Sequence, residues 1–111
     1  MSISARNWAW DASWTARGIH VPMKEKFTLL CLAEHENPEH GFSWPSQETI
    51  AARTEQSVRT VRNHIATLIA RQMITKGRRP SAKGEWDRNV YFLNVPDSYR
   101  EKDPEWMRWN G

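Results

Sequence analysis

Residues 57–71 carry side chains that suit nucleic-acid binding, and their apolar residues recur at helical spacing. On a helix of about 100° per residue, one face collects Val58, Val61, Ile65, Leu68 and Ile69. The opposite face has no acidic residue and presents Arg59, Thr60, Asn63, Thr67 and Arg71, flanked by Arg62 and His64. Arginine can pair bidentately with guanine, and asparagine with adenine. The pattern predicts a helix that reads DNA bases, with Arg59 and Asn63 near the centre of its polar face.

Two serines mark where helices begin in this part of the chain. Ser46 and Ser57 each stand directly before a helical pattern, where a serine hydroxyl accepts a hydrogen bond from an amide of the first turn. Only residues 54–56 separate the two patterns, so the helices must cross steeply. This is the layout of a helix-turn-helix, whose second helix enters the DNA major groove. We expect Ser46, Gln47 and Ser57 to contact DNA from the starts of the two helices.

The chain after the second helix predicts a β-hairpin. Residues 73–76 and 90–95 are rich in β-formers and would pair, and residues 42–44 could add a short first strand to make three. Residues 77–88 contain glycine, proline and several cations, as the long tip of a wing would. We expect phosphate or minor-groove contacts from Lys76, Arg78, Arg79, Lys83 and Arg88. For any single one of these residues, a solvated flexible loop explains the composition equally well.

The order of motifs along the chain resembles a known family. The matching pieces are residues 7–10, 26–35, 44–46, 50–54, 57–62 and 89–93. Residues 8–95 thereby resemble the winged helix-turn-helix proteins of phages, plasmids and actinobacteria, which include phage replication-initiator N-terminal domains and small transcription regulators. The resemblance implies an α+β fold, a winged helix-turn-helix with three main helices and a small antiparallel β-hairpin wing.

Two residues depart from the pattern of that family, which usually has glycine at both places. They are Glu55, in the turn, and Gln72, after the second helix. Glycine enters left-handed conformations freely, whereas any other residue in that conformation destabilises the fold by about 1 kcal/mol. The fold prediction stands, but the crossing angle of the two helices is left open.

The first helix is expected over residues 23–35, with Pro22 at or near its first position. Met23, Phe27, Leu30 and Cys31 would form one apolar face. Further apolar residues on other sides indicate burial from two directions.

The distribution of charge supports a polyanionic partner. Among 111 residues, 16 are lysine or arginine and 13 are acidic, which gives a net charge of only +3. Between Arg53 and Arg88, however, the acidic residues are only Glu55, Glu85 and Asp87. The middle of the chain therefore carries a local positive excess that suits double-stranded DNA.

Several other classes of protein lack support in the sequence. Cys31 is the only cysteine, which excludes an intramolecular disulfide and favours the cytoplasm. No apolar run reaches membrane-spanning length, and the start of the chain lacks a secretory signal. Cys31, His35 and His40 are too few for a zinc site without further ligands, and no catalytic constellation is present. We expect no cofactor, metal or small-molecule ligand, and no enzymatic activity.

The two ends of the chain are rich in tryptophan. An arm over residues 1–20 holds Trp8, Trp10 and Trp14, and a charged tail over residues 96–111 holds Trp106 and Trp109, on either side of a domain at 21–95. Trp8 and Trp10 alternate as on a strand, whereas Trp10 and Trp14 fit one face of a helix. The indoles either pack within one subunit or form a homodimer surface. We favour the homodimer, because one recognition helix covers little DNA.

These observations favour a sequence-specific double-stranded DNA-binding protein that controls transcription. The helix at 57–71 would lie in the major groove and the wing at 77–88 beside it. A replication-origin or excision-site binding protein of a phage or plasmid is the alternative. A protein-interaction module on the same fold, supported by the seven tryptophans, is a further one.

Overall fold

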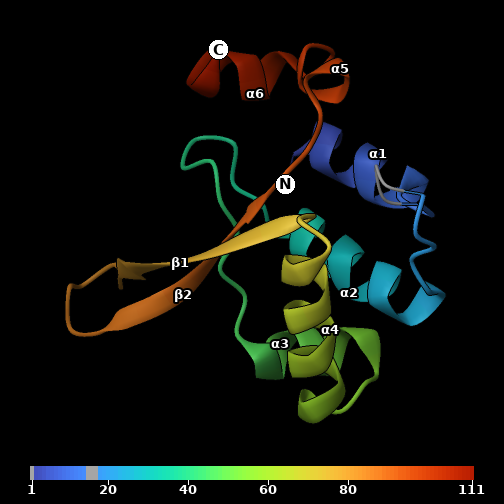
Figure 1. Cartoon of the computed structure of the whole chain (residues 1–111). Coiled ribbons are helices and arrows are strands. Elements are labelled where there is room, and N and C mark those ends of the chain that lie inside the picture. The colour runs from blue at the N-terminus through green and yellow to red at the C-terminus, as the bar shows by residue number, and fades with distance from the viewer. Residues whose placement is uncertain (1, 15–17) are drawn as a thin grey trace.

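The chain folds into six helices and one β-hairpin over the residues that the computed structural model describes, 2–14 and 18–111. In chain order these are α1 (Ile3–Asp11), α2 (Met23–Glu34), α3 (Gln47–Thr54), α4 (Val58–Ala70), β1 (Ile74–Pro80), β2 (Asp87–Leu93), α5 (Asp97–Arg100) and α6 (Pro104–Asn110). Helices α2, α3 and α4 with the antiparallel hairpin form a winged helix-turn-helix, which confirms the predicted α+β fold (Figure 1).

Serine caps begin both helices of the motif, as predicted. The Ser46 hydroxyl accepts a hydrogen bond from the Thr49 amide at 3.0 Å, and the Ser57 hydroxyl accepts one from the Thr60 amide at 3.0 Å. Each cap satisfies an amide that has no partner inside its helix. Figure 1 shows α3 crossing the lower end of α4, the steep arrangement that the short connection requires.

The core lies where α2 meets α3, α4 and the inner ends of the strands. Its centre contains Leu29, Leu32, Ile50, Val61 and Leu68, none of which has measurable exposure. In α4 the predicted inward face is correct for Val61, Ile65 and Leu68, while Ile69 is wrong because 37% of it is exposed. In α2 the predicted face is wrong in its first turns, since Met23 is 80% and Phe27 48% exposed. Phe27 is only half covered, because it borders a groove between α1, α2 and α3.

Both residues that replace glycine take the left-handed conformation. Glu55 has φ = 55° and ends α3, and Gln72 has φ = 61° and follows α4. The backbone at both positions thus has the conformation that a glycine would adopt. Because neither residue is glycine, this conformation is strained.

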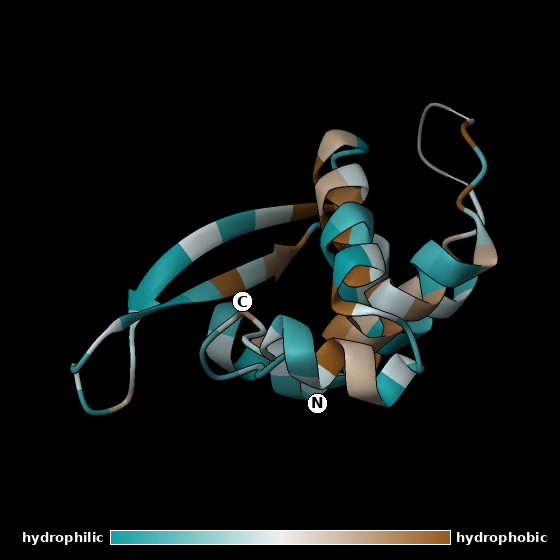
Figure 2. Ribbon diagram, turned by 90° about the horizontal axis from the view of Figure 1, so that it is seen from below, coloured by the Kyte–Doolittle hydropathy of each residue, from teal (hydrophilic) through white to brown (hydrophobic). Residues whose placement is uncertain are grey.

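The hairpin differs from its predicted form in two ways. Its strands are longer than expected, pairing from Ile74 with Leu93 to Pro80 with Asp87, so half of the predicted tip at 77–88 is strand and the loop is reduced to residues 81–86. The predicted third strand shrinks to one bridge, in which Ser43 and Tyr91 exchange two backbone hydrogen bonds of 2.9 and 2.7 Å. Figure 2 shows hydrophobic residues where the hairpin joins α4 and mainly hydrophilic ones along its outer half.

The N-terminal arm begins with a helix. Trp8 and Trp10 both lie on α1, which excludes the strand alternative for this pair, and α1 ends at Asp11, so Trp14 is not on the same helix face as Trp10. Trp8 is buried against the core, whereas Trp10 and Trp14 are exposed. The part of the arm at residues 1 and 15–17 lies outside the described residues.

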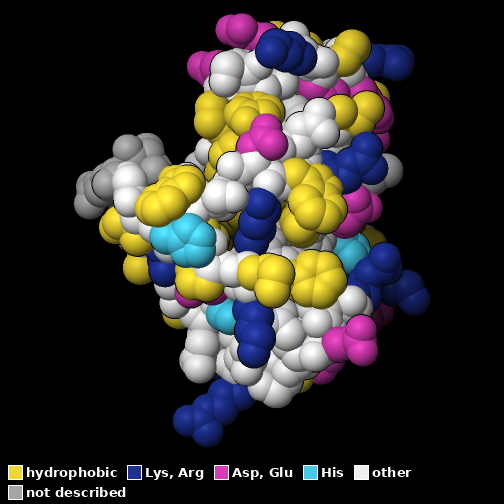
Figure 3. Space-filling model, turned by 90° about the vertical axis from the view of Figure 1, so that its right-hand side faces the viewer, with side chains coloured by type: hydrophobic (Ala, Val, Ile, Leu, Met, Phe, Trp, Pro, Cys, Tyr) yellow, Lys and Arg dark blue, Asp and Glu magenta, His cyan; other side chains and the backbone are white. Residues whose placement is uncertain are grey.

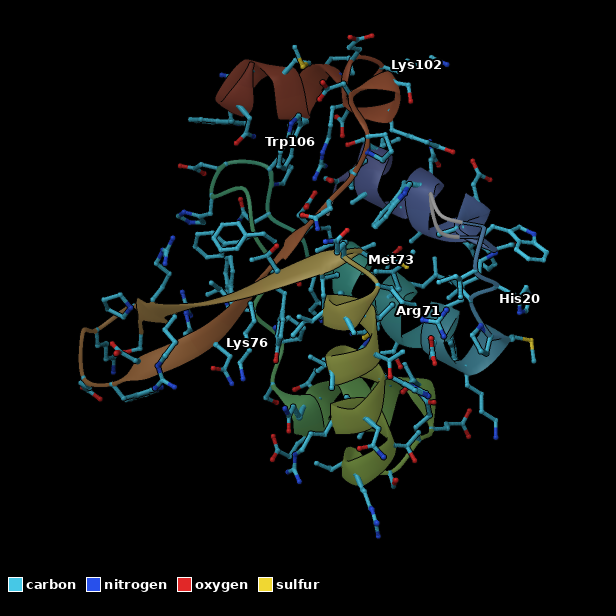
Figure 4. All side chains as sticks on the ribbon, viewed as in Figure 1. His20, Arg71, Met73, Lys76, Lys102 and Trp106 are labelled. Carbon is cyan, nitrogen blue, oxygen red and sulfur yellow. The ribbon has the colours of Figure 1, made fainter. Side chains whose placement is uncertain are left out.

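The C-terminal tail folds back onto α1 and the loop after α2. Arg100 forms a bidentate pair with Glu36, at 2.7 and 2.9 Å, and both side chains are buried. Arg100 also donates to Ser4 at 2.9 Å, and Ser2 donates to Glu36. The centre of the Trp106 ring lies 3.4 Å from the Arg100 guanidinium carbon, and Figure 4 shows Trp106 on the side of α6 that faces the rest of the chain. The polar cluster thus joins three segments that are far apart in sequence.

Asp103 adds a second link between the tail and α1. Its carboxylate accepts from the Ser4 amide at 3.0 Å, from the Ser4 hydroxyl at 2.6 Å and from the Trp106 amide at 3.1 Å. Burial alone would raise the pKa of Asp103, but these hydrogen bonds and nearby Arg100 hold it below its ordinary value. The same carboxylate caps the start of α6.

Candidate nucleic-acid interface

The outward face of α4 presents most of the residues predicted to read bases. Arg59, Arg62 and Asn63 are exposed, and Thr60 and Thr67 are half-buried beside them. Within the described ranges, the Arg59 and Asn63 side chains make no hydrogen bond or ion pair, so their donors are available. Thr60 is partly engaged by the Ser57 hydroxyl at 2.9 Å, and Thr67 donates to the Asn63 carbonyl at 3.0 Å. The exposed centre of the face is therefore Arg59, Arg62 and Asn63.

Two residues placed on or beside that face by sequence spacing face the protein instead. Arg71 donates to the His20 carbonyl at 2.8 Å and lies 3.3 Å from the Glu25 carboxylate, so it ties the end of α4 to α2 (Figure 4). The His64 ring lies 2.8 Å from the Thr28 hydroxyl, inside the junction of α2 and α4. The polar face is consequently shorter than predicted and ends near Thr67.

The junction around His64 is a small polar cluster. Thr28 also accepts a hydrogen bond from Gln56 at 3.0 Å, and Gln56 donates to Thr54 at 2.9 Å. Burial lowers the pKa of His64, and Lys24 acts in the same direction, while Glu25 opposes it. His64 is thus part of the packing that fixes α4 against α2, and burial there favours its uncharged form.

The start of α3 links the recognition helix to the wing. Gln47 is half-buried and lines one groove with Tyr91 of β2. The Gln47 side-chain oxygen also accepts from Arg62 on α4 at 3.4 Å. Ser46 is exposed one residue earlier, with its hydroxyl used as the cap. Both predicted contacts of the first helix therefore lie between the two main parts of the surface, and Gln47 contacts Arg62.

The cations of the wing divide between the two faces of the hairpin. In an antiparallel pair, alternate residues point to opposite faces, so Lys76 and Arg78 share a face with Tyr91. Figure 4 shows Lys76 extending to the side on which α3 and α4 lie. Arg79 and Arg88 are cross-strand partners on the other face, and Lys83 is exposed in the loop at 81–86.

That other face carries a cluster of aromatic rings. His40, Phe42, Trp44 and Phe92 make ring contacts with centroids 5.4 to 5.7 Å apart. Arg88 lies 4.6 Å from the centre of the Trp44 ring, and Arg79 lies 5.4 Å from that of Phe92. Such cation–ring pairs restrict both partners, so the base of the wing is stiffened by residues that sequence spacing did not connect. The signal was present in the alternation of Phe42 and Trp44 around Ser43.

The described parts of the chain offer no site for a metal ion and no membrane span. Residues 2–14 and 18–111 contain no group of three or more histidine, cysteine or acidic side chains placed to hold a metal ion. The His35 ring instead donates to the Cys31 carbonyl at 2.8 Å at the end of α2. No helix among the described residues is both long and apolar enough to cross a membrane.

The geometry defines a winged helix-turn-helix domain with an exposed basic recognition helix, and this arrangement indicates DNA binding. Residues 21–74 match the family described as "Helix-turn-helix domain", a span that runs from the residue before Pro22 to the first residue of β1. Comparisons with curated proteins and with solved structures each gave no match. The family match covers the helices of the motif and leaves out the wing, the arm and the tail.

Proposed function

We propose that this protein is a non-enzymatic, sequence-specific binder of double-stranded DNA that acts in the cytoplasm as a transcription regulator. The observation that carries the proposal is the exposed, acid-free centre of α4, where Arg59 and Asn63 have unused donors beside a capped helix start. In this arrangement α4 lies in the major groove, Arg59 pairs with guanine and Asn63 with adenine.

The flanking contacts come from the wing and from the start of α3. Lys76, Arg78 and Lys83 bind phosphates on the side of the hairpin and loop next to α4, and Ser46 and Gln47 approach the backbone between wing and helix. Arg79 and Arg88 are held over aromatic rings, so their contribution is smaller and comes from the edge of the hairpin. These contacts fix register and supply the salt-dependent part of the affinity.

Selection of bound duplexes from a random-sequence pool tests the proposal. We expect enrichment of a short motif that contains guanine and adenine at fixed spacing, and a steep loss of affinity with added salt. No enrichment, or affinity independent of salt, would favour a protein-interaction module on this scaffold. The position of the selected motif in the source genome would distinguish a promoter from a replication origin or excision site.

A homodimer on a repeated or palindromic site is the assembly that we propose. One recognition helix covers few base pairs, and two copies at whole-turn spacing read a longer site. The apolar residues left uncovered by the fold support this assembly: Trp10 is 61% exposed on α1, near Phe27 of α2, and both line one shallow groove. Figure 3 shows hydrophobic side chains spread over this side of the molecule, with charged ones between them.

Sedimentation of the full chain, alone and with DNA, measures the assembly. A dimer that dissociates in the variant Trp10→Ser/Phe27→Ser supports the α1–α2 face as its interface. A monomer at high protein concentration that binds one copy per DNA site contradicts the homodimer and leaves the DNA-binding proposal intact.

A further inference from the structure

Trp86 is a large apolar residue at the end of the wing with 60% of its surface exposed. It closes the loop at residues 81–86, whose other members are small or hydrophilic. An indole in this position is removed from the core, so the packing of the free protein does not account for it. A residue of this type at the tip of a DNA-binding hairpin is placed to contact the ligand.

The backbone of Trp86 is fixed although its ring is free. The Trp86 carbonyl accepts a hydrogen bond from the Ser81 amide at 2.7 Å, which closes the loop directly after the last strand pair. The Ser81 carbonyl accepts from the Gly84 amide at 2.9 Å, and Gly84 has φ = 70°, a conformation that suits glycine. Since the loop is already ordered, binding through Trp86 requires little further loss of conformational entropy.

The register places Trp86 on the same side of the hairpin as Arg88, and its exposed indole lies beside the start of α3. Trp86 lines a groove between the wing and the start of α3, together with Trp44, Ser46, Gln47 and Arg88. The groove leads from the loop to Gln47, which accepts a hydrogen bond of 3.4 Å from Arg62 of α4. A duplex seated on α4 would therefore pass within reach of Trp86.

The charges around the loop are mixed and balanced, so they do not by themselves select a polyanion. Lys83 and Arg88 flank Trp86 on either side, opposed by Glu85 and Asp87. Asp87 lies 4.0 Å from Arg78 and is partly neutralised by it. Glu48 also lines the groove at the start of α3, so phosphate binding alone does not explain this region. An apolar ring among mixed charges suits the floor of a DNA groove better than it suits the backbone.

Resting on the proposed function, we propose that Trp86 inserts its indole into the minor groove beside the α4 site and partly unstacks one base step. The minor groove is about 6 Å wide, which admits a flat ring edge-on. Apolar side chains that enter it act as wedges and kink the duplex towards the major groove. Pyrimidine–purine steps such as TA and CA/TG deform most readily, so Trp86 makes the wing select such a step at a fixed distance from the bases read by α4.

Wild type, Trp86→Ala and Trp86→Phe are compared on the duplex selected by the wild-type protein. The fluorescent base 2-aminopurine, placed in turn at each flanking position, reports unstacking, and energy transfer between dyes at the duplex ends reports bending. We expect wild type to brighten the probe at one flanking step, and Trp86→Ala to lose the signal and about tenfold in affinity. Trp86→Phe should retain part of both. Trp109→Ala, which removes an exposed indole from α6, is the matched control and should behave as wild type.

Wild-type binding without brightening at any flanking position would overturn the wedge. Unchanged affinity and bend in Trp86→Ala would overturn it as well, while the proposed function would still hold. Circular dichroism of each variant checks the fold, and if Trp86→Ala is unfolded, the milder Trp86→Phe decides the matter by the same signals. Failure of wild type to bind any duplex would instead reject the proposed function itself.

Discussion

At the scale of single residues, the proposed DNA-binding surface depends on which polar side chains have hydrogen-bond donors without a partner in the described part of the protein. Arg59 and Asn63 remain exposed, whereas Arg71 is held by Glu25 and His20. Helical spacing alone placed all three on one face. Sequence could not separate them because the partners of Arg71 come from α2 and from the segment before it, and their approach depends on how the helices cross.

His64 supplies a prediction at this scale. Its pKa in the folded protein is lowered from 6.5, mainly by burial, so the unfolded chain binds the proton more readily. The contribution of His64 to the free energy of unfolding should therefore be constant above neutral pH and fall as the pH drops below about 6.5. Urea unfolding of wild type and His64→Gln at pH 7.5 and 5.5 measures this effect. Wild type should lose more stability than the variant between the two conditions, and an equal loss would show that His64 does not titrate in this junction.

At the scale of elements, the helices follow from the sequence more closely than the hairpin does. The caps at Ser46 and Ser57 and the apolar spacing in α4 are local signals, and they gave the correct helix starts. The hairpin was predicted too short because Gly77 and the arginines after it have low or ambiguous strand propensity. Those residues are held in β1 by pairing with β2 and by rings on one face, which are contacts distant in sequence.

The division of the wing between two faces leads to a second prediction. Arg78 lies on the face next to α4, whereas Arg79 lies over Phe92 on the opposite face. Arg78→Ala should lower affinity by a similar factor for all sequences and make the salt slope shallower by about 0.9, as for one lost phosphate contact. Arg79→Ala, the matched control, should change the slope less. Salt titrations of both variants decide this, and a larger change for Arg79 would reverse the proposed orientation of the wing.

At the scale of the whole molecule, the arm and the tail are fastened to the domain by buried polar groups. Glu36 follows α2 with no side-chain exposure, and its partner Arg100 comes from α5. Sequence could not predict this pair because 64 residues separate the two. A chain cut at Val95 would leave Glu36 buried without its cation, so oligomeric state is best measured on the full chain.

The Glu36–Arg100 pair supplies the prediction at this scale. Arg100→Met leaves a buried carboxylate unpaired and should lower the free energy of unfolding by about 3–5 kcal/mol. The double variant Glu36→Leu/Arg100→Met removes both charges and should recover much of that loss. Urea unfolding of the single and double variants completes the cycle. If the double variant loses as much free energy of unfolding as the two single variants together, the two side chains do not act as a pair.

Dimethyl sulfate protection on the selected duplex tests the central claim most directly, because the reagent methylates guanine N7 in the major groove and adenine N3 in the minor groove. We predict protection of guanine N7 at the centre of the site, where α4 lies, and of adenine N3 only in the flank beside the wing. Arg59→Ala should lose the central N7 protection and keep the flanking one. A protein that protects adenine N3 throughout the site and leaves every guanine N7 reactive would contradict the placement of α4 in the major groove.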